Sequence, residues 1–316
     1  MTKSLLEVEN LTKKFTLGKK LFGQKEELLA VDNVSFSLDQ GKTLGIVGES
    51  GSGKSTLARC IIGLYREVQG KILFDGQDLL KMSPSQLRQM RGREMAMIFQ
   101  EPMTSLNPGL TIGYQIQEAL KIGQDLGKKE SRQRALDLVK MVDLPRPEKI
   151  LKAYPHQLSG GQRQRVMIAM GLANKPKLLI ADEPTTALDV TIQAQVLCLL
   201  DQLKKKTGTA ILLITHDLGV VAEMADYVVV MFHGRVVERG TVFEIFDQPA
   251  HPYTRALLAA RPSINIHADG IESHVESIRV QASQEEIDQE EPFEEIWLSE
   301  SHMVSSFANH QEVDHD

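Results

Sequence analysis

The chain has 316 residues, of which 42% are hydrophobic and 25% are charged, a composition typical of a soluble protein with one large domain or two modest ones. No apolar run approaches the ~18 residues that a membrane-spanning helix needs, so we expect no such helix. The net charge of −6 is unevenly distributed, because residues 263–316 contain 14 acidic residues and one basic residue, whereas residues 1–262 carry +7.

The cysteines and the N-terminal residues indicate the cellular compartment. Cys60 and Cys198 fall in helical patterns and have the spacing of neither a disulfide framework nor a metal site. The N-terminal residues show no secretory pattern, so we expect a reducing, cytoplasmic environment. The acidic tail lacks periodicity and is expected to be solvated. A charge of +7 on the remaining chain is weak support for a nucleic acid or an anionic lipid as partner.

The first part of the chain is rich in predicted strands. Residues 5–15 partly alternate apolar and polar side chains and predict an edge strand. A polar loop is expected at 18–27, followed by strands at 30–38 and 70–76, so we expect this part to be antiparallel. Phe15 ends the first strand and is a candidate for stacking on an adenine ring, although it could also be a packing residue.

A glycine-rich segment at residues 48–55 follows an apolar run at 44–47 and precedes a helical pattern. Strand, glycine loop and helix in this order predict a loop that binds phosphates through inward-pointing backbone N–H groups. Lys54 is expected to reach the β- and γ-phosphates, and the Ser55 hydroxyl to hold Mg²⁺. The alternative is a glycine-rich turn that binds nothing. The predicted nucleotide-binding residues are Gly48, Glu49, Ser50, Gly51, Ser52, Gly53, Lys54, Ser55 and Thr56.

A short apolar strand at residues 95–99 ends at Gln100, whose amide is expected to touch a Mg²⁺-bound water and a mobile neighbouring segment. Residues 101–157 then show helical spacing, with a proline-rich break at 144–147. We therefore predict a mainly helical insertion, and a helical subdomain over about 101–173.

A second glycine motif follows at residues 158–162. Ser159 is a plausible N-cap of a helix at 163–173, and two glycines expose the backbone amides at its start. This motif either binds an anion or is only structural. The candidate binding residues are Ser159, Gly160, Gly161 and Gln162.

Two further apolar strands end in polar residues. Residues 178–181 read as a strand buried on both faces and end in Asp182 and Glu183. Asp182 is expected to bind Mg²⁺ through water, and Glu183 to orient and deprotonate the attacking water. The alternative is two solvated carboxylates. The strand predicted at 210–215 ends at His216, a further catalytic candidate.

The candidates share a position at strand ends. Gly48, Gln100, Asp182 and His216 each follow an apolar strand. Because the carboxyl ends of parallel strands meet at one edge of a sheet, we expect these residues to lie together.

In this order, the motifs resemble the ATP-binding cassette of ABC transporters. The segments that carry the resemblance are 48–55, 100, 158–162, 179–183, 188–189 and 216, within about residues 5–262. The resemblance implies an α/β fold of the P-loop NTPase class, with a mainly parallel core sheet, an antiparallel N-terminal part and a helical insertion. It also implies that Asp189 contacts the nucleotide. We expect an ATP-binding domain at 1–262 and an acidic, partly disordered extension at 263–316.

Three segments narrow the subfamily. Residues 99–108, 154–157 and 251–258 resemble oligopeptide and dipeptide importer ATPases, and the loop between Phe15 and Ala30 resembles the second of their two ATPase subunits. Some relatives carry cysteines that bind an iron–sulfur cluster beyond the cassette. No cysteine follows Cys198 here, so no such cluster is predicted.

The resemblance implies a head-to-tail dimer in which the phosphate loop of one subunit and the glycine motif of the other enclose ATP and Mg²⁺. The implied partners are two transmembrane permease subunits, a second ATPase subunit and, indirectly, an external solute-binding protein, with no nucleic acid. The implied location is peripheral, on the cytoplasmic face of the bacterial inner membrane. Other solutes, such as nickel or glutathione, and a DNA-repair type of ABC ATPase remain alternatives.

Overall fold

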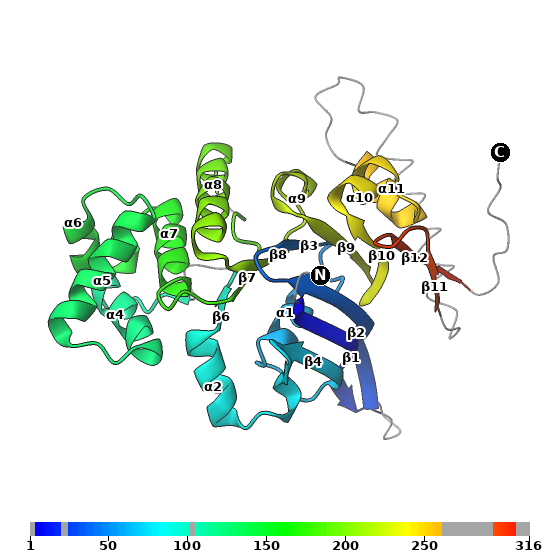
Figure 1. Cartoon of the computed structure of the whole chain (residues 1–316), viewed down its shortest axis with the longest axis horizontal. Coiled ribbons are helices and arrows are strands. Elements are labelled where there is room, and N and C mark those ends of the chain that lie inside the picture. Colours follow the sequence, from blue (N-terminus) through cyan, green and yellow to red (C-terminus); the bar gives the residue numbers. More distant parts are fainter. Residues whose placement is uncertain (1–3, 20–24, 101–104, 187, 261–292, 308–316) are drawn as a thin grey trace.

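The computed structural model describes residues 4–19, 25–100, 105–186, 188–260 and 293–307 (Figure 1). Residues 101–104, directly after Gln100, lie outside the described residues. So do 263–292 and 308–316, for which disorder was expected. The described strands form two sheets, and helices cover the larger one.

The smaller sheet is antiparallel and has the order β2-β1-β4-β5. Its strands are β1 (Ser4–Lys19), β2 (Lys25–Asp39), β4 (Gln69–Phe74) and β5 (Gln77–Asp78). The prediction of an edge strand at 5–15 is wrong, because β1 lies between β2 and β4, with Leu6 paired to both Leu38 and Phe74. Alternation shows which face of a strand is buried but does not show how many neighbours it has.

β1 and β2 are also longer than predicted. They pair from Ser4 and Asp39 as far as Lys19 and Lys25, so most of the expected polar loop at 18–27 belongs to strands of a hairpin. Toward its far end the apolar Leu17 and Leu28 are exposed, and the neighbouring sequence is rich in lysine and glutamate, so the apolar alternation on which strand prediction depends is missing.

The larger sheet has the order β11-β12-β10-β9-β3-β8-β7-β6. Its strands are β3 (Thr43–Val47), β6 (Met95–Ile98), β7 (Leu178–Asp182), β8 (Ala210–Ile214), β9 (Tyr227–Phe232), β10 (Arg235–Thr241), β11 (Phe293–Trp297) and β12 (Met303–Phe307). The five strands from β9 to β6 run parallel, which confirms the predicted parallel core.

The central strands are buried on both faces. Alternate residues of β7 belong to different hydrophobic clusters: Leu178 and Ile180 pack toward the antiparallel sheet and α1 (Lys54–Ile61), whereas Leu179 and Ala181 pack toward the helices on the other face. β8 alternates in the same way. Burial on both faces explains the continuous apolar runs in the sequence.

The helical insertion lies at one end of the molecule (Figure 1). Its helices are α4 (Ile112–Gly123), α5 (Lys128–Met141), α6 (Pro147–Lys152) and α7 (Gly160–Gly171), with a 3₁₀ turn at Pro155–Gln157. The predicted break at 144–147 is confirmed: Arg146 takes a left-handed conformation and Pro147 begins α6. The remaining helices are α2 (Pro84–Arg93), α8 (Val190–Thr207), α9 (Leu218–Met224), α10 (Val242–Asp247) and α11 (Pro252–Ala259), with a 3₁₀ turn at Leu79–Lys81.

Part of the acidic tail joins the sheet. β12 pairs with β10 through Glu238 and Val304, and β11 pairs with β12. His302 is buried and its Nε2 lies 2.7 Å from Oε1 of the fully buried Glu238. The expectation of a solvated tail therefore fails for His302, Met303 and Ser305, which are buried against the sheet, whereas residues 294–300 are exposed as expected.

Candidate functional site

The phosphate loop connects β3 to α1 and curls over its own lysine. The Lys54 ammonium is buried and donates to the carbonyls of Gly48 and Glu49 at 2.7 and 2.6 Å and to Ser52 Oγ at 3.2 Å. Burial lowers the pKa of Lys54, and the carboxylates of Glu183 and Asp182 oppose that shift. The loop therefore holds a desolvated cation at its centre, where it would bind a phosphate strongly.

Glycine is required where this loop passes other segments. Gly53 has φ +97°, and a Cβ there would lie 2.2 Å from the Ala30 carbonyl oxygen of β2. Gly48 has φ +149°, and its Cβ would lie 2.1 Å from the Met231 carbonyl oxygen of β9. Any side chain at these positions would push the loop away from its neighbours.

Asp182, at the end of β7, lies within hydrogen-bonding distance of the phosphate loop. It is fully buried, and its Oδ1 accepts a hydrogen bond of 2.9 Å from Ser55 Oγ. Burial raises the pKa of Asp182, and the hydrogen bond from Ser55 opposes that shift. Its Oδ2 is buried and has no hydrogen-bond partner among the described residues. A hydroxyl beside an unsatisfied carboxylate oxygen is a donor set that suits Mg²⁺, so these residues fit the expected metal.

Glu183 is the meeting point of the other candidates. Its Oε2 accepts hydrogen bonds from Gln100 Nε2 at 2.7 Å and from Thr186 Oγ1 at 2.9 Å. Its Oε1 lies 3.2 Å from His216 Nδ1. Glu183 also has φ +48°, a strained conformation for a residue with a side chain. The predicted meeting of these residues at one sheet edge is confirmed, and Thr186 is an addition that the sequence analysis missed.

A pocket of about 320 Å³ extends from the phosphate loop to Phe15. Phe15 packs edge-on against Tyr65 with ring centroids 5.2 Å apart, and Lys13 Nζ lies 4.9 Å from the centre of the Phe15 ring. The pocket is lined by Phe15, Leu28, Leu29, Ala30, Ser50, Gly51, Gly53, Lys54, Ser55, Thr56, Gln100, Glu183, His233 and Gly234. The wall from β2 and from the β9–β10 turn was not predicted, because no local motif marks it.

The second glycine motif lies outside this pocket. Ser159 Oγ accepts from the Gln162 backbone N–H at 3.3 Å, and Gln162 Oε1 accepts from the Ser159 N–H at 3.1 Å, which forms a capping box on α7. Asp189 caps α8 by accepting from the Ile192 N–H at 2.9 Å. Ser159 and Asp189 are exposed and are not among the residues that line the nucleotide pocket.

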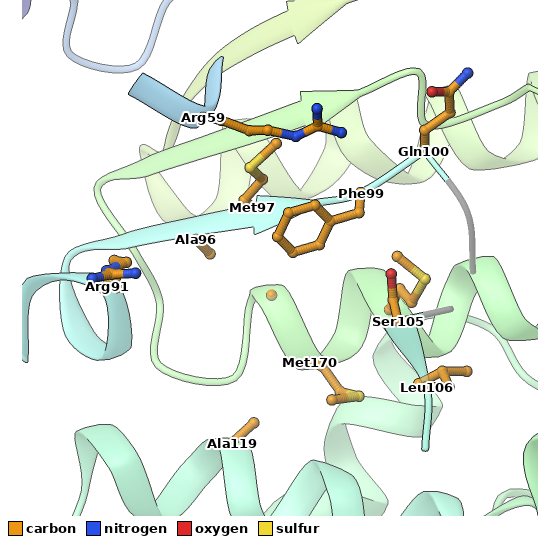
Figure 2. Close-up of a pocket in the computed structure, with 12 residues that line it drawn as sticks. Arg59, Arg91, Ala96, Met97, Phe99, Gln100, Ser105, Leu106, Ala119 and Met170 are labelled. Carbon is orange, nitrogen blue, oxygen red and sulfur yellow. The ribbon is translucent and has the colours of Figure 1, made fainter. Parts of the chain in front are cut away.

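A larger pocket, of about 640 Å³, lies where β6 meets the helical insertion (Figure 2). Met97 of β6, Phe99 just beyond the end of β6 and Met170 of α7 line it, together with the charged side chains of Arg59 and Arg91. Gln100 lines both this pocket and the nucleotide pocket, so a partner bound here would lie beside a residue that touches Glu183.

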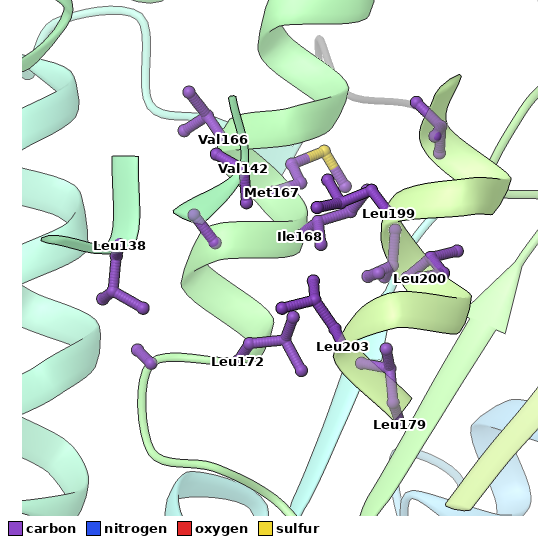
Figure 3. Close-up of a cluster of buried hydrophobic side chains, with 14 of the residues drawn as sticks. Leu138, Val142, Val166, Met167, Ile168, Leu172, Leu179, Leu199, Leu200 and Leu203 are labelled. Atoms are coloured by element: carbon purple, nitrogen blue, oxygen red, sulfur yellow. The ribbon is translucent and has the colours of Figure 1, made fainter. Parts of the chain in front are cut away.

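The helix that begins with the glycine motif is joined to the sheet by a continuous core. Figure 3 shows Val166 and Ile168 of α7, and Leu172 directly after it, packed between Leu138 of α5 and Leu200 of α8. The same cluster includes Leu179 and Ala181 of β7, the strand that ends at Asp182. A continuous packed core therefore joins α7 to the strand that ends at the site.

The fold and the site define a P-loop nucleoside triphosphatase. A family described as "ABC transporter" matches residues 31–186, and one described as "Oligopeptide/dipeptide transporter, C-terminal region" matches residues 237–289. The chain belongs to the ABC transporter family. It binds and hydrolyses ATP, and the hydrolysis is coupled to transport.

The relatives agree with this assignment. The chain is 54% identical over 271 residues to the oligopeptide transport ATP-binding protein AppD of Bacillus subtilis, covering 84% of this chain and 81% of that protein. It is 56% identical over 237 residues to the dipeptide transport ATP-binding protein DppD of Escherichia coli, covering 74% and 72%. A solved dimer of the ATP-binding cassette MJ0796, bound to ADP and Pi after hydrolysis, matches with a TM-score of 0.68 and 30% identity over 75% of this chain and 98% of that one. The predicted family and fold class are confirmed.

Proposed function

We propose that this chain is the ATP-hydrolysing subunit of an importer of oligopeptides or dipeptides. The observation that carries the proposal is the match of residues 237–289 to the C-terminal region of oligopeptide and dipeptide transporters, a region that lies outside the general cassette match at 31–186. The relatives named for peptide transport share more than half of their aligned residues with this chain.

In the proposed reaction, the phosphate loop holds the triphosphate and Glu183 acts as the general base for water. The hydrogen bonds from Gln100 and Thr186 hold Oε2 and leave Oε1 beside His216. A carboxylate held in one position orients the attacking water toward the γ-phosphate. His216 lies on the same side and would position the γ-phosphate.

Ser55 and Asp182 are the proposed residues for Mg²⁺, and Gln100 would contact a water of its shell. The unsatisfied Oδ2 of Asp182 and the hydroxyl of Ser55 support this assignment. When bound, Mg²⁺ would neutralise negative charge on the β- and γ-phosphates. Ser55 would release Asp182 Oδ1, because its oxygen would then face the metal.

The site is proposed to be completed by a second ATPase subunit. At the α7 terminus the N–H groups of Gly160 and Gly161 have no hydrogen-bond partner among the described residues, Ser159 beside them is exposed, and none of the three lines the pocket of their own chain. Two anion-binding ends that lie apart in one chain form a closed site when two chains pair head to tail. Gln162 and Asp189 would lie at the same junction.

The pocket of about 640 Å³ is the proposed docking site for a permease subunit. It is lined by apolar side chains of the sheet edge and the insertion, and it includes Gln100. An occupant would therefore contact the residue that donates a hydrogen bond to Glu183. Among the described residues, no helix is long and apolar enough to cross a membrane. We propose two permeases, an external solute-binding protein acting through them, and a peripheral position on the cytoplasmic face of the bacterial inner membrane.

A reconstituted complex tests the substrate. The chain would be purified with its permeases and solute-binding protein in lipid vesicles, and ATP hydrolysis measured with dipeptides, oligopeptides, glutathione or nickel. We expect stimulation by peptides and none in a Glu183→Gln complex. Stimulation by glutathione or nickel alone would contradict the peptide assignment, and salt-sensitive DNA binding without permease association would favour the DNA-repair alternative.

A further inference from the structure

A second concave site lies on the helical insertion. It is a groove of about 500 Å³ between α4, α5 and α6, and it shares no lining residue with the nucleotide pocket or with the pocket at β6. Its charged lining residues are Lys128, Lys129 and Arg132 of α5 and Lys152 and Glu148 of α6. Four cations and one carboxylate leave the groove strongly positive.

These four cations are not used by the fold. Among the described residues, none of them forms an ion pair within 4.0 Å. Elsewhere in the chain, Lys42, Lys177 and Lys204 each pair with a carboxylate at 2.9–3.0 Å. Unpaired like charges gathered in a concavity repel one another and focus a positive potential, which favours an anionic ligand.

We propose that this groove binds a small anion that carries two or more phosphate groups. Arg132 offers a planar fork that matches a phosphate, and the three lysines supply mobile point charges around it. Thr111, Gln117 and Gln133 add neutral hydrogen-bonding groups to the lining, which also includes the exposed side chain of Tyr114.

The shape decides between a discrete ligand and a membrane surface. A lipid bilayer presents many headgroups to a flat or convex basic face, whereas four cations that line a hollow of this size suit one small molecule. The charged residues come from two helices with a packed core beneath them, so their backbone positions are held independently of any ligand.

Inorganic tripolyphosphate is a suitable probe. In the full-length Lys54→Ala chain, whose phosphate loop is impaired, titration calorimetry should show one binding event. Replacing Lys128, Arg132 and Lys152 together by alanine should lower that affinity about tenfold or more, because each exposed contact contributes a fraction of a kcal/mol to about 1 kcal/mol. In the otherwise wild-type chain, the same triple replacement should remove one of two binding events.

A matched control is available on the same helices. Replacing Lys121, Lys140 and Lys149 by alanine removes the same total charge, one lysine each from α4, α5 and α6. None of these three lysines lines the groove. At about 0.15 M salt this variant should bind within about twofold of its parent, since the three lysines are exposed, do not line the groove, and interact with its ligand only through salt-screened electrostatics. Equal loss in both triple variants, or no groove-dependent binding, would overturn the proposal. So would binding only to vesicles containing phosphatidylglycerol.

Discussion

At the scale of single residues, Glu183 shows how three short segments form one site. Gln100 arrives at the end of β6, His216 follows β8, and Thr186 lies in the turn after Glu183 itself. The left-handed backbone of Glu183 costs on the order of 1–3 kcal/mol and is retained where the carboxylate is needed in one orientation.

We expect Glu183→Gln to bind ATP with nearly unchanged affinity and to lower kcat by about 10²–10⁴-fold, because the amide keeps the shape but cannot accept a proton. Single-turnover hydrolysis and equilibrium binding measure the two effects separately. Glu118→Gln, the same change at an exposed position of α4, should keep full activity. Normal turnover in Glu183→Gln would show that another residue acts as the general base.

Replacing Lys54 by alanine should weaken ATP binding by at least about tenfold, since the ammonium is the one cation that the phosphate loop encloses. Fluorescent-nucleotide titration measures this, and circular dichroism checks that the chain is folded. Lys14→Ala, at an exposed position near Phe15, is the control. An unchanged affinity would show that the loop binds no phosphate.

At the scale of elements, a side-chain cap fixes the start of several helices, including α7, α8 and α11. His251 caps α11: its Nδ1 accepts from the Tyr253 N–H at 3.1 Å, so its ring must remain neutral. Burial lowers the pKa of His251 to about 4, and the carboxylate of Glu238 opposes that shift. The stability of the first turn of α11 is therefore expected to depend on pH, because only the neutral His251 ring can accept this hydrogen bond.

A folded pKa below the unfolded value means that protonation favours the unfolded chain. The contribution of His251 is thus complete above about pH 6.5 and is lost as the pH falls toward 4, with an upper limit of about 3 kcal/mol. Urea unfolding from pH 7.5 to 4.5 should show this loss in the wild type. His251→Ser, which keeps a capping oxygen but does not titrate, should lose less stability over the same range. Parallel curves would contradict the assignment.

At the scale of the whole molecule, the nucleotide site and the α7 terminus point to pairing. Ser159 is exposed and lies outside the nucleotide pocket of its own chain, yet α7 shares a hydrophobic core with β7, the strand that ends at Asp182. An ATP clamped between two chains would therefore couple their separation to the helical insertion and to the pocket at β6.

Ser159→Arg should abolish ATP-dependent dimerisation of Glu183→Gln chains while sparing ATP binding to the monomer, because a bulky side chain would fill the junction. Size-exclusion chromatography with and without ATP measures this. Ser83→Arg is a close control, since Ser83 forms the same capping box, with Gln86, at the exposed start of α2. If both variants dimerise equally well, the glycine motif does not form the junction.

The sequence by itself determined the phosphate loop, the polar residues at the strand ends and the parallel core, because these depend on local spacing and on apolar runs. Only the tertiary structure decided which strands are neighbours: that β1 lies inside its sheet, that part of an acidic tail joins β10, and that Leu28, Ala30 and His233 wall the nucleotide pocket. Such contacts join residues far apart in the chain, so they depend on hydrogen bonding and packing between segments whose pairing no local pattern records.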